Sequence, residues 1–426
     1  MIRVSVSRVS KIVAQSFDNS TPRLRGDGVA MEALERRILY AAGDLDSSWG
    51  DGGIVGIGAG AGTNAFGENI LLDANGRMLV AGYATDANGV FGLWLARYNA
   101  DGTPDTTFGG GDGQVVWHDM KSGAVDLDID ANGNILVTGS IWTTAYYPDD
   151  WGVWRFHNDG SLDASFGDNG FVHGGNSSNI EGVSSVFALP DGKIMTVENV
   201  VMESGHQLIS VSRYLHDGTL DEFWNGDGHK WVFFDGARQG AANGGIMLPD
   251  GSLLITGSTF IIDAEHRSID NELLLVKIDP NGFGPATDEE DFGVMSSPVA
   301  GSRVARTPLT GMAGLAPNAA IDSAGRIVVS GMHEVKGILV RYTADGMLDA
   351  SFGNGGIVHT NYLDTGSHSV IALDADDNIL ATFGYSVTGR TKLARFLADG
   401  AVDRSFGSNG DVPTIASASN FVIRVF

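Results

Sequence analysis

The sequence predicts an all-β fold, namely a β-propeller built from four-stranded antiparallel blades. A motif centred on an aromatic residue recurs about once every sixty residues, in copies that start at Leu45, Pro104, Leu162, Leu220, Asp288, Leu348 and Val402. Between these copies a second pattern recurs, in which an apolar run, a tight turn and a β-rich run follow one another. Each unit of such a series can bury its apolar face only against its neighbours, so the repetition indicates a repeat architecture.

The unit from Ala124 to Val172 shows the elements of one blade in order. AVDLDID alternates apolar and polar residues, DANG is a hairpin turn, and NILVTGS is a second strand. GVWRFH is a third strand, and the turn NDGS leads to a fourth strand around ASFGDNGFV. Glycine is abundant, with 60 of 426 residues, as expected for many strands joined by tight turns. Four antiparallel strands in each unit make one propeller blade.

The number of blades follows from counting strands. The motif that contains the fourth strand occurs seven times, whereas complete second and third strands occur six times. A fourth strand without a blade would leave an unpaired edge, which proteins avoid. We therefore favour seven blades, the last closed by both termini, with residues 36–40 as its third strand and residues 421–426 as its first. A six-bladed ring with an extra strand is the alternative.

The units resemble NHL-type repeats and, more closely, the delta-60 repeats of bacterial proteins. The delta-60 pattern joins LDxxFGxxG, a hairpin similar to DGKILVAG, and LARYNxDGxLD. Residues 93–102, 337–346 and 392–400 match its last part, and the resemblance extends from residue 45 to about residue 412. The unit that begins near Phe292 departs most from the pattern because a long insertion follows it. This resemblance implies a propeller fold and little about activity.

The N-terminal segment differs from the repeats. Leu34 to Leu39 reads LERRIL and resembles the LExRxLL leader segment of planctomycete surface and secreted proteins. We therefore divide the chain into a leader or targeting segment, residues 1–44, partly disordered, and a single propeller domain, residues 45–426. A helical or strand-like turn that enters the propeller is the alternative for this segment. The resemblance implies an extracellular or cell-surface protein.

Composition excludes several classes of partner. The formal net charge is −25, and an acidic body repels the phosphates of nucleic acids and anionic membrane surfaces. The chain has no cysteine, which removes disulfides, thiol catalysis and cysteine-ligated metals. No apolar stretch approaches the ~18 residues that cross a bilayer. We therefore expect neither nucleic-acid binding nor membrane insertion, and we expect a monomer.

Loop length indicates which face of the propeller binds. Antiparallel strands place the turns after the first and third strands on one face, and the loops after the second and fourth strands on the other. The turns are short and uniform, whereas the loops are long and differ between units, as binding loops usually do. Two of these loops, IWTTAYYPDDW and STFIIDAEHRSIDN, combine aromatic and charged residues. The candidate ligand-binding residues are Trp142, Tyr146, Tyr147, Asp149, Asp150, Trp151, Glu265, His266 and Arg267. Packing against the blade edge is the competing interpretation of the aromatic rings.

Catalytic and cofactor motifs are missing from the sequence. The segment from Asp130 begins like a calcium-binding EF-hand loop, but Ile135 and Ile141 stand where glycine and glutamate are required. HExxH, GxSxG and GxxxxGK[ST] do not occur. We expect no catalytic residue, metal or cofactor, and a non-catalytic binding or scaffold module for a carbohydrate or protein ligand. The rival is a polysaccharide hydrolase or lyase with acidic or histidine groups at the mouth of the central channel.

Overall fold

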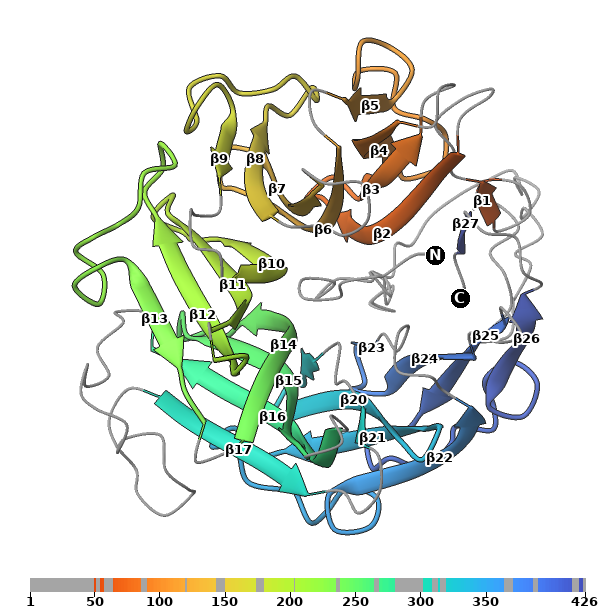
Figure 1. The fold of residues 1–426 in the computed structure, drawn as a ribbon. Helices are drawn as coiled ribbons and strands as arrows, with labels where there is room; N and C mark the ends of the chain where they lie inside the picture. Colours follow the sequence, from red (N-terminus) through yellow and green to blue (C-terminus); the bar gives the residue numbers. More distant parts are fainter. Residues whose placement is uncertain are drawn as a thin grey trace, which may run out of the picture.

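The chain forms a ring of β-sheets (Figure 1). The computed structural model describes residues 50, 54–56, 64–85, 90–118, 121–142, 150–173, 180–202, 204–234, 238–263, 268–279, 302–308, 313–314, 319–363, 371–385, 390–415 and 421–423. These residues form strands and turns and contain no helix, so the all-β prediction is confirmed. Within them, six four-stranded antiparallel blades follow one another along the chain.

The first three blades take the strands in chain order. Blade 1 consists of β2 (Asn64–Leu72), β3 (Met78–Thr85), β4 (Phe91–Tyr98) and β5 (Gln114–Trp117). Blade 2 consists of β6 (Ser122–Ile129), β7 (Ile135–Ile141), β8 (Asp150–Phe156) and β9 (Phe171–His173). Blade 3 consists of β10 (Ile180–Ala188), β11 (Ile194–Val201), β12 (Gln207–Tyr214) and β13 (His229–Val232).

The other three blades repeat this order, with one interrupted strand. Blade 4 consists of β14 (Arg238–Met247), β15 (Leu253–Ile262), β16 (Ser268–Ile278) and β17 (Ser302–Pro308). In blade 5, β18 (Ala313–Gly314) and β19 (Ala319–Ile321) both pair with β20 (Ile327–His333), and β21 (Lys336–Tyr342) and β22 (Ile357–Leu363) follow. Blade 6 consists of β23 (Ile371–Leu373), β24 (Ile379–Tyr385), β25 (Arg390–Phe396) and β26 (Asp411–Ile415).

The first strand of a blade lies nearest the centre of the ring and the fourth lies at the rim, as Figure 1 shows for β6 to β9. The first and second strands are joined by the predicted Asx-type turns. In blade 2, one carboxylate oxygen of Asp130 accepts the backbone N–H groups of Asn132 and Asn134, and Gly133 takes the left-handed φ of 83° that the turn requires. The Asp-Gly sequences therefore serve as turn formers.

The first and last strands of the described residues meet between blade 1 and blade 6 (Figure 1). There β1 (Ile54–Gly56) and β27 (Phe421–Ile423) pair antiparallel as a two-stranded sheet. The preference for seven four-stranded blades is thus not confirmed, and the described residues contain the alternative number, six. Residues 421–423 pair with β1, which is the fourth-strand segment of the first motif copy, and so they do not take the place of an innermost strand. The prediction of a seventh blade assumed that the fourth strand of the first motif copy would otherwise have an unpaired edge. That strand is β1, and β27 covers its edge. Residues 36–40 lie outside the described part of the chain.

Apolar layers fill the seams between neighbouring blades. Separate clusters of buried side chains join blade 1 to 2, 2 to 3, 3 to 4, 4 to 5 and 5 to 6, and a sixth packs Val55 of β1 onto blade 1. Successive residues of one strand pack in the layers on opposite sides of the blade, because successive side chains point to opposite faces of a sheet. In β7, for example, Val137 faces blade 1 and Leu136 faces blade 3.

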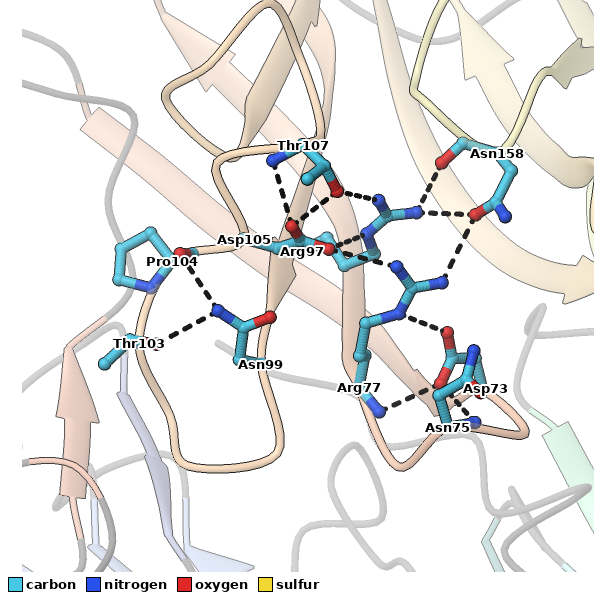
Figure 2. A network of polar contacts seen from close by, with 10 residues as sticks. All are labelled: Asp73, Asn75, Arg77, Arg97, Asn99, Thr103, Pro104, Asp105, Thr107 and Asn158. Carbon is cyan, nitrogen blue, oxygen red and sulfur yellow. Dashed lines mark hydrogen bonds and ion pairs between the residues drawn. The ribbon is translucent and has the colours of Figure 1, made fainter.

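The recurring motif forms a polar clasp that joins blade 1 to 2, blade 2 to 3 and blade 5 to 6. In blade 1, Arg97 donates through Nε to Asp105 (2.7 Å) and through Nη1 to the backbone carbonyl of Asn158 in blade 2 (Figure 2). Its guanidinium lies 4.7 Å from the centroid of the Phe108 ring. The N–H of Gly109 donates to the carbonyl of Asp159 in blade 2 (2.9 Å). The same guanidinium–aromatic stacking recurs at Arg155, Arg213, Arg341 and Arg395. The motif therefore encodes a contact between blades.

The charges of this clasp are held by hydrogen bonds. Burial raises the pKa of Asp105, but hydrogen bonds from Thr107 and the charge and hydrogen bond of Arg97 outweigh burial and bring the pKa down to about 2. The corresponding aspartates Asp163, Asp221, Asp349 and Asp403 also have lowered pKa values. These carboxylates are therefore ionised over the whole range in which proteins usually work.

Candidate functional site

Aromatic side chains gather in the seam between blades 1 and 2, towards the face that carries the long loops. We call this group the aromatic seam; it comprises Phe66, Tyr83, Phe91 and Trp117 of blade 1, and Trp142, Trp154, Phe171 and His173 of blade 2. Because β2, β3, β4 and β5 contribute one ring each from blade 1, the rings follow the seam from the inner strand to the rim. They form two connected series.

The inner series ends on an exposed ring. Phe66 stacks on Tyr83 with ring centroids 5.0 Å apart, and Tyr83 lies 5.6 Å from Phe91. Phe91 in turn lies 6.4 Å from Trp142 of blade 2, with the two ring planes only 24° apart. Phe91 is 44% exposed, whereas Phe66, Tyr83 and Trp142 are half-buried. Phe91 and Trp142 therefore present two nearly parallel rings at the surface, supported from beneath by the others.

The outer series ends on a polar pair. Trp117 contacts the buried Trp154 edge-on at 5.8 Å, Trp154 lies 4.9 Å from Phe171, and the ring of Phe171 meets that of His173. The imidazole Nε2 of His173 lies 2.6 Å from a carboxylate oxygen of Asp150. The side chain of His173 is 48% exposed and that of Asp150 is 18% exposed. A hydrogen-bonding group thus stands at the end of the apolar surface.

Two glycines leave room for rings of the aromatic seam, and a third leaves room for His118. A Cβ on Gly152 would lie 2.0 Å from the ring of Phe171, and a Cβ on Gly92 would lie 2.6 Å from the imidazole of His118. On Gly123, a Cβ would meet the indole of Trp142 at 3.3 Å. Any side chain at the first two positions would displace its neighbour, so the aromatic seam depends on glycine at position 152.

Charged groups of both signs flank the aromatic seam. Burial raises the pKa of the Tyr83 hydroxyl, and the negative charge of Glu68 raises it further, so Glu68 lies close enough to act on this ring. The exposed Lys121 accepts the backbone N–H of Trp142 on its carbonyl, at 2.9 Å. Together with Asp150 and His173, these side chains supply hydrogen-bond donors and acceptors around two open rings.

The structure separates the residues that the sequence proposed for the site. Trp142 belongs to the aromatic seam, and Asp150 contacts the seam through His173. Trp151 does not, because it is only 1% exposed and packs in the layer between blades 2 and 3. Neighbouring residues of a strand point to opposite faces, so Asp150 and Trp151 serve different seams. Tyr146, Tyr147, Asp149, Glu265, His266 and Arg267 lie outside the described residues.

Sequence reasoning missed Phe66, Tyr83, Phe91 and Phe171, although the repeat contained a usable signal for one of them. Six residues before the arginine of the third strand, the units carry Phe91, Asp149, Gln207, Val335 and Gly389. Only blade 1 has an aromatic residue at that position among these five units. An aromatic residue at a position that the other units fill with polar, small or aliphatic residues indicates a local role.

A hollow of about 670 Å³ marks the other end of the same seam. Its walls include the glycine loop 109–111, Gln114 of β5 and Ser161 in blade 2. Thr107 lines this hollow and also contacts Arg97 (Figure 2), so the hollow lies beside the clasp. This hollow opens on the face of the short turns, opposite to the face on which the sequence placed binding.

No three histidine, aspartate or glutamate side chains of the described ranges lie close enough together to hold a metal ion. The part of the chain that the structure describes also has no helix long and apolar enough to span a membrane.

Comparison with known proteins supports the repeat assignment. Residues 74–108, 131–166, 325–352 and 379–406 match the family model described as a β-propeller domain of unknown function (DUF5122). The matches fall in blades 1, 2, 5 and 6, and each runs from a first turn or second strand to the recurring motif. The chain is therefore a β-propeller repeat protein. No curated protein matches it by sequence.

Solved structures with a similar arrangement have little sequence in common with this chain. A protein of unknown function from Dyadobacter fermentans is 12% identical, with a TM-score of 0.49, 78% of this chain covered and 93% of that one. An ulvan lyase bound to -[GlcA(1-4)Rha3S]- is 10% identical, with a TM-score of 0.45 and coverage of 84% and 81%. A Hadza microbial sialidase is 12% identical, with a TM-score of 0.40 and coverage of 73% and 65%.

Proposed function

We propose that this propeller is a non-catalytic binding module that holds a carbohydrate on the aromatic seam. The observation that carries the proposal is the pair of nearly parallel rings, Phe91 and Trp142, at the surface where blades 1 and 2 meet. A flat ring offers a large rigid contact area for the apolar face of a sugar, at a small cost in side-chain entropy. Large exposed aromatic groups on a soluble protein commonly mark a binding surface.

The polar groups at the seam suit a ligand rich in hydroxyls. The carboxylate of Asp150 accepts a hydrogen bond from His173, and the exposed Lys121 is joined to Trp142 through its backbone carbonyl. A sugar presents both kinds of partner around an apolar ring face, so a mixed set of donors and acceptors is more suitable than one strong charge. The ring of Phe91 packs beside the half-buried Tyr83, which favours one orientation before the ligand arrives and lowers the entropy cost of binding.

The proposal includes a location outside the cell or at its surface. It is supported by the resemblance of the units to delta-60 repeats and of residues 34–39 to the leader segment of surface proteins. Attachment of fluorescent protein to intact cells, and its release by competing polysaccharide, would test the location separately from the ligand.

The ligand is tested by a glycan and polysaccharide screen followed by calorimetry. We expect Phe91→Ala to weaken binding of the selected glycan by about tenfold or more, which corresponds to about 1.4 kcal/mol, because the exposed ring is lost. Phe233→Ala is the matched control, since Phe233 is 43% exposed but belongs to blade 3. Equal weakening by both variants, or no glycan bound by the wild-type protein, would reject the proposal.

The same incubation tests the enzymatic alternative. A hydrolase or lyase would shorten the polysaccharide over hours, which size-exclusion chromatography detects. A non-catalytic module leaves the polymer at its original length. Shortened polymer that persists in Phe91→Ala would place the function at the central channel instead of at the aromatic seam.

A further inference from the structure

A buried glutamate, Glu198, stands at a position where most blades carry glycine. The fifth residue of the second strand is Gly82, Gly139, Gly257 and Gly331 in blades 1, 2, 4 and 5, and Phe383 in blade 6. In blades 1, 2 and 4 a Cβ there would lie 1.8 to 2.4 Å from a backbone carbonyl oxygen of the inner strand. Such a contact is impossible, so the regular blade excludes any side chain at this position.

Blade 3 makes room for Glu198 by a change in strand register. The inner strands of blades 1, 2, 3 and 4 share one irregularity beside this residue, between Val183 and Ser185 in blade 3. Blade 3 adds a second register shift between Ile180 and Gly182, which these other three blades lack. An extra bulge moves the backbone locally, and bulges often re-aim a side chain beside a functional position. The inner strand is thus altered where the glutamate requires space.

Hydroxyl groups surround the carboxyl of Glu198. The side chain is 0% exposed, Thr196 donates a hydrogen bond to Oε1, and Ser210 and Ser212 also form hydrogen bonds with the carboxyl. Within the described residues, Oε2 of Glu198 has no hydrogen-bond partner, and neither does Nε1 of Trp151, which faces the same seam from blade 2. Burial raises the pKa of Glu198 to about 8, against the opposing effect of the hydroxyl groups.

Within the part of the chain that the structure describes, no cation is recorded against this carboxyl to neutralise it when it ionises. The arginine of blade 2 that reaches into the seam, Arg155, is engaged by Asp163 at 2.7 Å. Asp126 and Asp128, in the inner strand of blade 2, accept the backbone N–H groups of Val186 and Ala188. The hydroxyl of Tyr214 in blade 3 has its pKa raised by burial and by the charge of Glu198. An ionised Glu198 would therefore add an uncompensated negative charge to an apolar layer.

A hydrogen-bonded path connects the carboxyl to the rim of the blade. Ser212, which bonds Glu198, also lies 2.9 Å from Nδ1 of His229 on the outermost strand, β13. His229 is half-buried, and burial lowers the pKa of its imidazole. The charge of Asp227 opposes this effect but does not outweigh it. A proton can thus pass from the interior to the rim through one serine hydroxyl, without opening the seam.

From these contacts we propose that the joint between blades 2 and 3 is a pH-sensitive contact, closed while the carboxyl of Glu198 is protonated and loosened when it ionises. The proton comes from water and returns to water, and no bond other than O–H is made or broken. The loosened joint involves Trp151 directly, and Asp150 of the aromatic seam is its neighbour in β8. This inference does not depend on the identity of any ligand.

The test measures amide hydrogen exchange of β7, β8, β10 and β11 between about pH 6 and about pH 9.5, corrected for the intrinsic effect of pH on exchange. In the wild-type protein we expect protection in these strands to fall by about tenfold as the pH passes through the range where the carboxyl ionises. Glu198→Gln should keep its protection throughout. Glu272→Gln is the control, because Glu272 is also buried but pairs with Arg238 in blade 4.

A second measurement keeps the proposal testable if Glu198→Gln does not fold. The infrared absorption of a protonated carboxyl group, followed in the wild-type protein over the same range, should disappear as exchange in these strands rises. An absorption that is already absent at about pH 6, or protection that falls equally in wild type and Glu198→Gln, would overturn the proposal.

Discussion

Replacing Arg155 by alanine should loosen the clasp between blades 2 and 3 and lower the free energy of unfolding substantially. The guanidinium donates through Nε to Asp163 at 2.7 Å and through Nη1 to the carbonyl of His216 in blade 3, and it lies 4.6 Å from the centroid of the Phe166 ring. The two charged side chains are only 11% and 7% exposed. Removing the cation therefore leaves a buried carboxylate and a carbonyl group without their partner.

The size of the effect follows from these contacts. Breaking a buried ion pair by removing one partner costs about 3–5 kcal/mol, because the other charge stays buried. Asp163 keeps hydrogen bonds from the hydroxyl and N–H groups of Ser165, which favours the lower end of that range. The lost hydrogen bond to His216 adds about 1 kcal/mol, and the lost stacking on Phe166 adds less. We expect Arg155→Ala to lower the free energy of unfolding by roughly 3–5 kcal/mol in total.

Urea denaturation followed by tryptophan fluorescence measures this loss, and a double-mutant cycle with Asp163→Asn assigns it. The double variant should lose less free energy of unfolding than the two single variants lose together, because neither charge is then buried alone. Lys193→Ala is the control, since Lys193 lies 3.2 Å from Asp221 but is 30% exposed, and should lose less than about 1 kcal/mol. A loss for Arg155→Ala no larger than that of the control would refute the view that the motif holds the blades together.

Three further predictions concern the turn, the termini and acid. Gly133→Val should cost about 1–3 kcal/mol, seen as a lower melting temperature with unchanged glycan binding, because a β-branched residue is strained at a φ of 83°. Deleting residues 421–426 should lower the melting temperature by several degrees, because β1 loses its partner strand; an unchanged melting curve would show that this pair does not stabilise the ring. The folded pKa of Asp105, about 2, lies below its ordinary value of 3.8, so its contribution to stability is complete above about pH 4 and is lost as the pH falls through 2. Acid denaturation of Asp105→Asn should therefore depend less steeply on pH than that of the wild-type protein.

Periodicity in the sequence was sufficient to predict the blades. The alternation in AVDLDID and the Asx turn at Asp130 depend on neighbours within a few residues, so β6 and β7 could be located from local patterns alone. The strand count also predicted that both ends of the chain meet, and β1 and β27 do pair. The count could not determine which strands of a partial blade form, because that depends on contacts between segments more than 360 residues apart.

The candidate site was predicted only in part, for a geometric reason. Asp150 and Trp151 are adjacent in sequence, yet one contributes to the aromatic seam and the other to a buried layer, because a strand alternates its side chains between two faces. The exposed ring of Phe91 meets Trp142 from a different blade, which only the assembled ring brings together. Glu198 was missed because a glutamate after an apolar run resembles the end of a strand. Its significance emerges when it is aligned with the glycines of the other units.

The clasp of the recurring motif also has a direction. Gly109, Gly167 and Gly353 each donate to a turn in the blade that follows in sequence, and Gly50, ahead of the first complete blade, does the same to Asp101. During synthesis each glycine N–H donor leaves the ribosome before the carbonyl that accepts its hydrogen bond. The donor of one unit is therefore present when the next unit emerges and packs against it. A duplicated gene segment that spans one period would bring both halves of this contact with it. Rings with more or fewer units can therefore arise by recombination, without the invention of a new interface.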